Sequence, residues 1–214
     1  MRSSKPIHGD AWPHDMGITV EDRPSALLEL LWIREAYELQ PEGNDLPPRL
    51  TDTPERPTGS VVPETVRIEW QAAWPRIWRA AAAHAGHEPE RDLFGQLQQT
   101  ADGSAERAVL LRRLIGPNWH DEFGDMAFAD NAYSVWANSG MESLRAARRT
   151  KVRDSPERRD LVALVPAWRA GLTKIVTIPC IGEFTQKLAG HALLVTDATR
   201  DDSAAYRRAL TSFS

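Results

Sequence analysis

Reactive and polar side chains follow two apolar runs near the C-terminus. Cys180 comes after the run Leu172–Ile178, and Asp197 comes after the run Ala192–Thr196. Both runs have the length and composition of buried strands, and α/β sheets tend to place their sites just beyond strand ends. A short helix after the first strand would lower the thiol pKa through its dipole. Because His191 is the nearest histidine along the chain, Cys180, His191 and Asp197 are the catalytic candidates if the protein is an enzyme.

The same cysteine also has a purely structural interpretation. Free cysteine is among the most buried residue types and packs as a small apolar side chain. The arrangement matches no cysteine-enzyme signature, since Gln186 stands where a phosphatase-type loop would carry an arginine. We therefore expect a buried, unreactive thiol at Cys180. As the chain's single cysteine, it cannot form an intramolecular disulfide.

Histidines and acids in the middle of the chain are of types that bind zinc. His84 and His87 are three residues apart, so they share a face if both lie on one helix. With His120 and Asp121 from a second segment, they could hold a catalytic zinc with an open position. However, the order H-x-x-H-E differs from the H-E-x-x-H motif, and Gly86 between the histidines favours a helix end. The alternative is a pair of exposed histidines at a helix C-terminus, and we expect no cofactor.

One short segment of this acidic chain is strongly basic. The whole chain carries a formal charge of −4, whereas residues 145–159 hold seven basic and two acidic side chains. Arginine binds phosphate and carboxylate groups through paired donors, so the segment could contact nucleic acid or an acidic partner. The alternative is a solvated turn between two helices. The candidate binding residues in the segment are Arg145, Arg148, Arg149, Lys151 and Arg153.

Three tryptophans recur on one face of a predicted helix over residues 63–85. Trp70, Trp74 and Trp78 lie at i, i+4 and i+8. Such a stripe is typical of a hydrophobic core, but tryptophan is also favoured in binding hot spots. Burial of the rings would decide between a core stripe and a contact surface. Pro75 predicts a kink or a split in this helix.

The remaining pattern is mostly helical and divides the chain near residue 60. Residues 41–60 contain five prolines and two glycines, which exclude a helix or a central strand. We therefore predict an N-terminal arm, first helix and Pro-rich linker over 1–60, and a main helical α+β domain over 61–214. Helices are predicted over residues 22–40, 63–85, 90–100, 104–115, 139–149, 155–170 and from 202 onward. Ser104 and either Asp202 or Ser203 are the expected N-caps, and Ser155 is expected to open its helix.

The predicted fold class is α+β, helix-dominated, with a small C-terminal sheet of two to four strands. Residues 182–189 are predicted to form about two turns of helix, which is marginal for a parallel crossover. The relative direction of the two C-terminal strands therefore stays open. In the helix predicted over 104–115, the apolar face consists of Ala108, Leu111, Leu114 and Ile115.

Composition and missing motifs favour a protein that works by contact. The chain lacks a glycine-rich phosphate loop, a membrane-length apolar run and a secretory h-region, and its one cysteine fits the cytoplasm. We predict a non-enzymatic soluble interaction protein, namely an adaptor, an immunity-type protein or a regulatory subunit. It would contact another protein or a second copy of the chain through the Trp-rich face or the Arg-rich segment.

Two alternatives belong to other functional classes. The first is a hydrolase or group-transfer enzyme with a strand-end site that uses Cys180 or a His/carboxylate metal centre. The second is a nucleic-acid accessory protein that uses the basic segment 145–159. None of these interpretations involves a membrane.

Overall fold

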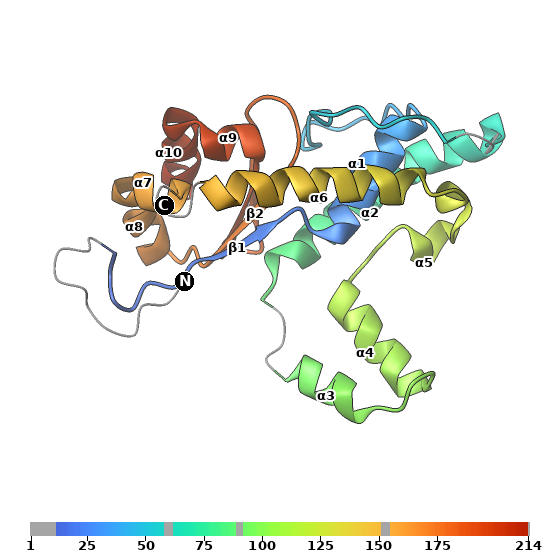
Figure 1. Ribbon diagram of the computed structural model, residues 1–214, viewed down its shortest axis with the longest axis horizontal. Helices are drawn as coiled ribbons and strands as arrows, with labels where there is room; N and C mark the ends of the chain where they lie inside the picture. The colour runs from blue at the N-terminus through green and yellow to red at the C-terminus, as the bar shows by residue number, and fades with distance from the viewer. Residues whose placement is uncertain (1–11, 58–61, 89–91, 151–154, 214) are drawn as a thin grey trace.

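The fold is helix-dominated α+β with a four-stranded sheet, as predicted (Figure 1). The computed structural model describes residues 12–57, 62–88, 92–150 and 155–213, and only the backbone over 143–150. None of the helices in this part of the chain has the length and apolar character needed to cross a membrane.

The sheet has the order β1-β2-β4-β3 and draws strands from both ends of the chain. β1 pairs with β2 and β2 pairs with β4 in parallel, whereas β3 is antiparallel to β4 at the edge. β4 is thus inserted between β2 and β3. The strands are β1 (Thr19–Asp22), β2 (Lys174–Ile178), β3 (Thr185–Leu188) and β4 (Ala192–Thr196).

The helix predicted over residues 182–189 is wrong, because this segment contains the edge strand β3. β3 returns the chain antiparallel to β4, so β4 can run parallel to β2 without a helical crossover. A tight turn joins β3 to β4, with positive φ at Ala189 (45°) and Gly190 (77°). Backbone pairing with β4 has therefore decided the structure of a segment whose own pattern is weak.

Helices cover both faces of the sheet. α1 and α2 pack with Val176 and Leu194 on one face, while α8 and α10 pack with Ile175 and Leu193 on the other. The helical elements are α1 (Ser25–Ala36), α2 (Glu64–Gly86), α3 (Leu93–Gln99), α4 (Ala105–Ile115), α5 (His120–Phe123), the 3-10 turn η1 (Met126–Phe128), α6 (Ala132–Thr150), α7 (Pro156–Arg159), α8 (Leu161–Arg169), α9 (Asp197–Asp201) and α10 (Ser203–Thr211).

Several helix boundaries follow the predicted caps. Ser104, Ser155 and Asp202 each accept a hydrogen bond from the first turn of the helix that follows. The start predicted at Ser139 is wrong, since the Asp130 carboxylate accepts from the Ala132 amide and α6 begins there. α2 is also not split at Pro75 but runs as one helix.

The N-terminal segment packs with the rest of the chain. β1 forms part of the sheet, and the buried leucines of α1 belong to the same core as α2. Burial inside this chain accounts for the nearly all-round apolar character of the first helix. Within the Pro-rich stretch, Leu50 forms an isolated bridge with Cys180.

The tryptophan stripe on α2 lies in the core. Trp70, Trp74 and Trp78 are all fully buried, and the rings of Trp74 and Trp78 stack with centroids 5.4 Å apart. Trp74 Nε1 donates to the Leu30 carbonyl oxygen at 2.8 Å, which ties α2 to α1. The contact-surface interpretation of these three side chains is therefore wrong.

The replacement Trp74→Ala should lower the free energy of unfolding by about 3–5 kcal/mol, because it leaves a large cavity and removes the hydrogen bond to the Leu30 carbonyl oxygen. Ile68→Ala on the same helix is the control, because Ile68 is 59% exposed and its loss should cost less than about 0.5 kcal/mol. Urea unfolding measures both. Equal effects of the two substitutions would contradict the assignment of the stripe to the core.

Candidate functional site

The structure does not bring the three catalytic candidates together. Asp197 follows β4 directly and Cys180 follows β2 by two residues, so both lie at the carboxyl ends of parallel strands. His191 precedes β4 and lies at the opposite end, about 20 Å away along the strand. The predicted triad is therefore split between two edges of the sheet.

The Cys180 thiol is in an environment that keeps it protonated. Its side chain is only 1% exposed, and burial raises the pKa to about 12, with Arg34 opposing and Glu35 and Asp197 adding to the shift. The sequence suggested a helix after Cys180 whose dipole would lower the thiol pKa, but the strand β3 follows instead. Both the burial and the raised pKa fit the interpretation of Cys180 as a buried, unreactive thiol.

The charged groups at the strand ends bind one another. Arg23 pairs with Asp197 at 2.9 Å and donates to the Gly140 carbonyl oxygen at 2.9 Å, which ties α6 to the end of β1. Arg200 forms a two-pronged pair with Glu157 at 2.8 and 3.0 Å. Burial alone would lower the Arg200 pKa, but the Glu157 carboxylate more than offsets this and raises it.

The space left at this edge is small. A cavity of about 110 Å³ lies beside Arg23 and Pro179, and the Arg23 charge is already paired with Asp197. Buried ion pairs of this kind hold elements in a fixed arrangement. This edge of the sheet therefore positions α6, α7 and α9.

The four metal candidates are engaged separately. His84 Nε2 lies 3.2 Å from the Leu114 carbonyl oxygen, and His87 Nδ1 lies 2.7 Å from that of Ala83. His120 contacts Asp125 at 2.6 Å, while the Asp121 carboxylate accepts from the Asn118 amide at 2.9 Å. Within the described ranges, no three His, Cys, Asp or Glu side chains form a group that could hold a metal ion.

The basic segment stays a prediction. Lys151 and Arg153 lie outside the described residues, and so do the side chains of Arg145, Arg148 and Arg149 on α6. The two arginines of the segment whose side chains are described make intramolecular contacts. Arg158 lies over the Trp12 ring, and Arg159 donates to the backbone of α9.

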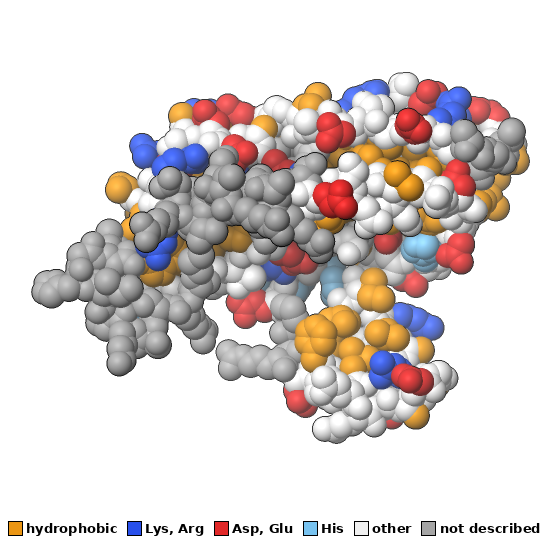
Figure 2. All heavy atoms as spheres, viewed as in Figure 1, with side chains coloured by type: hydrophobic (Ala, Val, Ile, Leu, Met, Phe, Trp, Pro, Cys, Tyr) orange, Lys and Arg blue, Asp and Glu red, His pale blue; other side chains and the backbone are white. Residues whose placement is uncertain are grey.

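A large cleft lies between the hairpin formed by α3 and α4 and the rest of the described structure, which we call the body. Figure 1 shows the hairpin standing apart from the body, and Figure 2 shows hydrophobic side chains on the hairpin beside the hollow. The cleft has a volume of about 910 Å³. Its apolar lining consists mainly of Leu27, Ala81, Ala85, Leu93, Leu114 and Ile115.

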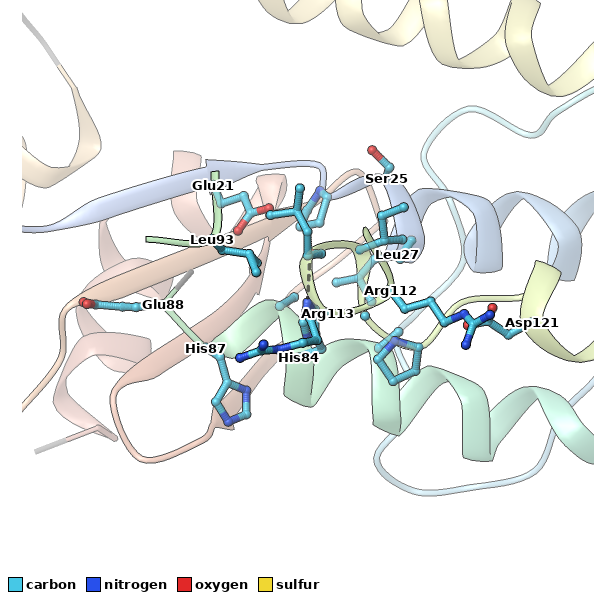
Figure 3. A pocket seen from close by; sticks show the side chains of 18 of the residues that line it. Glu21, Ser25, Leu27, His84, His87, Glu88, Leu93, Arg112, Arg113 and Asp121 are labelled. Atoms are coloured by element: carbon cyan, nitrogen blue, oxygen red, sulfur yellow. Dashed lines mark hydrogen bonds between the residues drawn. The ribbon is translucent and has the colours of Figure 1, made fainter. Parts of the chain in front are cut away.

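Charges of opposite sign flank this apolar lining. The body contributes Glu88 and Asp121, whereas the hairpin contributes Arg112 and Arg113. Figure 3 shows the Arg112 side chain directed toward Asp121. Also on the body side, the buried Lys174 pairs with Glu21 at 2.6 Å, so its charge is neutralised.

A close contact between two residues joins the hairpin to the body. Gly116 ends α4 with φ of +74°, and a Cβ built on it would lie 2.2 Å from the His84 ring. The His84 ring also hydrogen-bonds to the Leu114 carbonyl oxygen. The sequence offered His84 as a zinc ligand. In the structure His84 instead contacts the end of α4 and so fixes the position of the hairpin relative to α2.

The hairpin itself is poorly covered. Its small core consists of Leu93, Leu97 and Leu110, with Leu114 packed beside them. The apolar face predicted for α4 is partly wrong, because Ala108, Leu111 and Ile115 are exposed. Phe94 and Val109 are also exposed, at 58% and 52%. Apolar side chains of α3 and α4 therefore lie in water outside the contact between the two helices.

No residue named from the sequence as a candidate predicted this cleft as a whole. The signal in the sequence was the run Val109-Leu110-Leu111, followed by Leu114 and Ile115, which is apolar over more than one helix face. Such a helix needs cover on several sides, and α3 supplies only one of them.

No protein-family model, curated protein or solved structure matches the chain.

Substituting Gly116 should displace the hairpin, because Gly116→Ala drives a methyl group into the His84 ring. Gly103→Ala is the matched control, since Gly103 has φ of +75° but open space around its Cα. Both positions have positive φ, but Gly116 (φ +74°, ψ −172°) lies in a region that is essentially restricted to glycine, so Gly116→Ala also carries a backbone cost of roughly 1–3 kcal/mol. Only Gly116→Ala should speed amide exchange in α4, and adding His84→Ala should relieve the clash. Equal amide exchange rates of α4 in Gly116→Ala and Gly103→Ala would contradict the role of the Gly116–His84 contact in positioning the hairpin.

Thiol reagents should modify Cys180 very slowly in the folded protein. With a pKa of about 12, roughly one thiol in ten thousand is ionised at pH 8. Unfolding in urea should restore an ordinary thiol and speed the reaction with a chromogenic disulfide reagent by at least about a hundredfold. Cys180→Ser supplies the blank. A rate in the folded protein close to that in urea would restore the nucleophile hypothesis.

Proposed function

We propose that the chain is a non-enzymatic interaction protein that holds an amphipathic helical segment of a protein in the cleft beside the α3–α4 hairpin. The apolar lining of the cleft, flanked by charges of opposite sign, carries this proposal. Helix-in-groove recognition uses an apolar helix face for affinity and flanking charges for orientation. The buried single cysteine fits a cytoplasmic setting.

The state of the other candidate sites supports contact rather than catalysis. The strand-end charges pair with one another, and the Cys180 pKa is far above neutral. General bases and nucleophiles need pKa values close to the working pH. The cleft, at about 910 Å³, leaves far more room for another molecule than the cavity of about 110 Å³ at the strand ends.

The hairpin supports the same function. Helices of the length of α3 and α4 are marginal on their own and need packing against other elements. α3 and α4 pack against each other more than against any other single element, so an incoming helix would complete a three-helix arrangement. A partner would then gain affinity from apolar area that the isolated chain leaves in water.

The acids of the body wall argue against nucleic acid as the occupant of this cleft. Glu88 and Asp121 would face the phosphates and repel them. A protein segment with both signs of charge suits the two rims better. The basic segment 145–159 stays a separate hypothesis about another surface.

Selection from a displayed library of 15-residue amphipathic helical peptides tests the proposal on the full chain. Enriched peptides should bind with an apolar i, i+3, i+4 pattern. Ile115→Glu, at a cleft position that is 52% exposed, should weaken them by roughly tenfold or more. Burying the exposed half of the isoleucine contributes about 0.8–1.5 kcal/mol, and the new carboxylate would also have to leave water. Fluorescence anisotropy measures the change.

Val162→Glu is the control for the added charge, because Val162 lies on α8 and is 86% exposed. It should leave peptide binding unchanged. If selection enriches no peptide, or if the enriched peptides bind Ile115→Glu as well as the original chain, the cleft is not the binding site.

A further inference from the structure

We propose that His87 and His191 together bind one late transition-metal ion, such as Zn²⁺ or Cu²⁺, where the end of α2 meets the β3–β4 turn. The proposal is independent of peptide binding in the cleft and gives the chain a second site. It follows from the ring nitrogen that carries the proton in each histidine, from the distance between the rings and from the contacts that hold both residues.

The fold brings together two histidines that the sequence assigned to different sites. His87 was a metal candidate and His191 a catalytic candidate, and neither set of candidates comes together in the structure. The two rings instead contact each other, with centroids 6.3 Å apart and planes at 78°. His191 precedes β4 and so lies at the amino ends of the parallel strands, which is where α2 ends beside the start of β2.

Each ring makes the hydrogen bond that prepares a histidine to bind a metal ion. His87 Nδ1 lies 2.7 Å from the Ala83 carbonyl oxygen. His191 Nδ1 lies 2.9 Å from the Ala189 carbonyl oxygen. A carbonyl oxygen can only accept, so Nδ1 carries the proton and, in the neutral ring, Nε2 keeps its lone pair. Metal-binding histidines almost always donate their other ring nitrogen to a carbonyl or a carboxylate in this way.

The Nε2 atom of His191 is buried and has no hydrogen-bond partner in the described structure. Buried polar atoms normally have partners, so an exception needs an explanation. The lone pair of a neutral imidazole is also the group through which histidine binds metals. His87 is an exposed residue, so an ion can reach the pair of rings from solvent.

The distance between the rings is within the reach of one ion. Zinc binds a histidine nitrogen at about 2.0–2.1 Å, and this nitrogen is itself about 1.1 Å from the ring centre. One ion can therefore bind two rings whose centres are up to about 6.4 Å apart, and a tetrahedral angle at the ion needs about 5.2 Å. The observed 6.3 Å lies inside the limit, and rotation of the exposed His87 ring supplies the remaining approach.

Both histidines are held by backbone contacts with the start of β2. Lys174 Nζ donates to the His87 carbonyl oxygen at 3.0 Å, and the Lys174 amide donates to the His191 carbonyl oxygen at 3.2 Å. Gly86 allows α2 to approach the β3–β4 turn closely, since a Cβ on it would lie 2.7 Å from Leu188 Cβ. The two rings therefore come from elements whose relative position is fixed.

Two neutral imidazoles suit late transition metals. Mg²⁺ and Ca²⁺ take oxygen ligands, whereas imidazole binds zinc, copper and nickel. The described residues contain no third His, Cys, Asp or Glu that completes such a group, so water or a group of another molecule fills the other positions on the ion. The nearby Lys174 ammonium pairs with Glu21 at 2.6 Å, which weakens its repulsion of a cation.

Isothermal titration of the full chain with ZnCl₂, CuCl₂ and MgCl₂ tests the proposal. Zn²⁺ should bind with a dissociation constant below about 100 µM, Cu²⁺ should bind more tightly, and Mg²⁺ should not bind. His87→Ala and His191→Ala should each weaken Zn²⁺ binding by at least about tenfold, because each leaves one imidazole. His120→Ala is the control and should leave binding unchanged, since His120 lies on α5 and contacts Asp125.

Magnetic resonance of the histidine rings locates the ion. Zn²⁺ should shift the ring signals of His87 and His191 together and leave those of His120 in place. Circular dichroism verifies the fold of each variant, and a glutamine replaces the alanine where the helical signal is lost. A chain that binds no Zn²⁺ up to about 1 mM overturns the proposal. So does Zn²⁺ binding that either single substitution weakens by less than about tenfold, because that ring is then not a ligand.

Discussion

Insertion of β4 between β2 and β3 is the constraint on which the rest of the structure depends. β4 is hydrogen-bonded on both sides and buried on both faces. Each face needs its own helical layer, and residues from both ends of the chain supply these layers. A strand in that position cannot be removed without exposing both cores to water, so both layers depend on it.

This arrangement also determines what the strand ends do. β1, β2 and β4 are parallel, so their carboxyl ends bring Asp22, Arg23 and Asp197 to one edge. In open α/β sheets such an edge often holds a ligand. Here the charges pair with each other and with Glu157 and Arg200 from the covering helices. Desolvated charges need partners, and the partners come from within the fold.

The α3–α4 hairpin differs from the body because its packing is incomplete. In the body, tryptophans and leucines fill the space between layers, and Trp74 also donates a hydrogen bond to the Leu30 carbonyl oxygen. The hairpin buries a few leucines and leaves Phe94, Val109 and Ile115 in water. Regions of low local packing are where binding energy is still available. The hairpin and the cleft beside it are therefore where this structure still has apolar surface to bury, and the Gly116–His84 contact joins the hairpin to the body.

Local signals in the sequence determined most of the helices and their caps. Ser104 and Ser155 cap as expected because N-capping depends on a few neighbouring residues. The spacing of Trp70, Trp74 and Trp78 likewise predicted one shared helix face, but only the structure showed that this face is buried. The helix expected over 182–189 failed, because pairing with β4 outweighs the weak preference of an edge segment.

Only the tertiary structure decided which reactive residues meet. Cys180, His191 and Asp197 are close in sequence, but the parallel direction of β2 and β4 sends His191 to the other edge of the sheet. Gly116 and His84 are far apart in sequence and touch in the fold. Spacing along a chain reports on contacts within one helix or strand. Contacts between elements depend on strand order and direction, which this sequence alone leaves open.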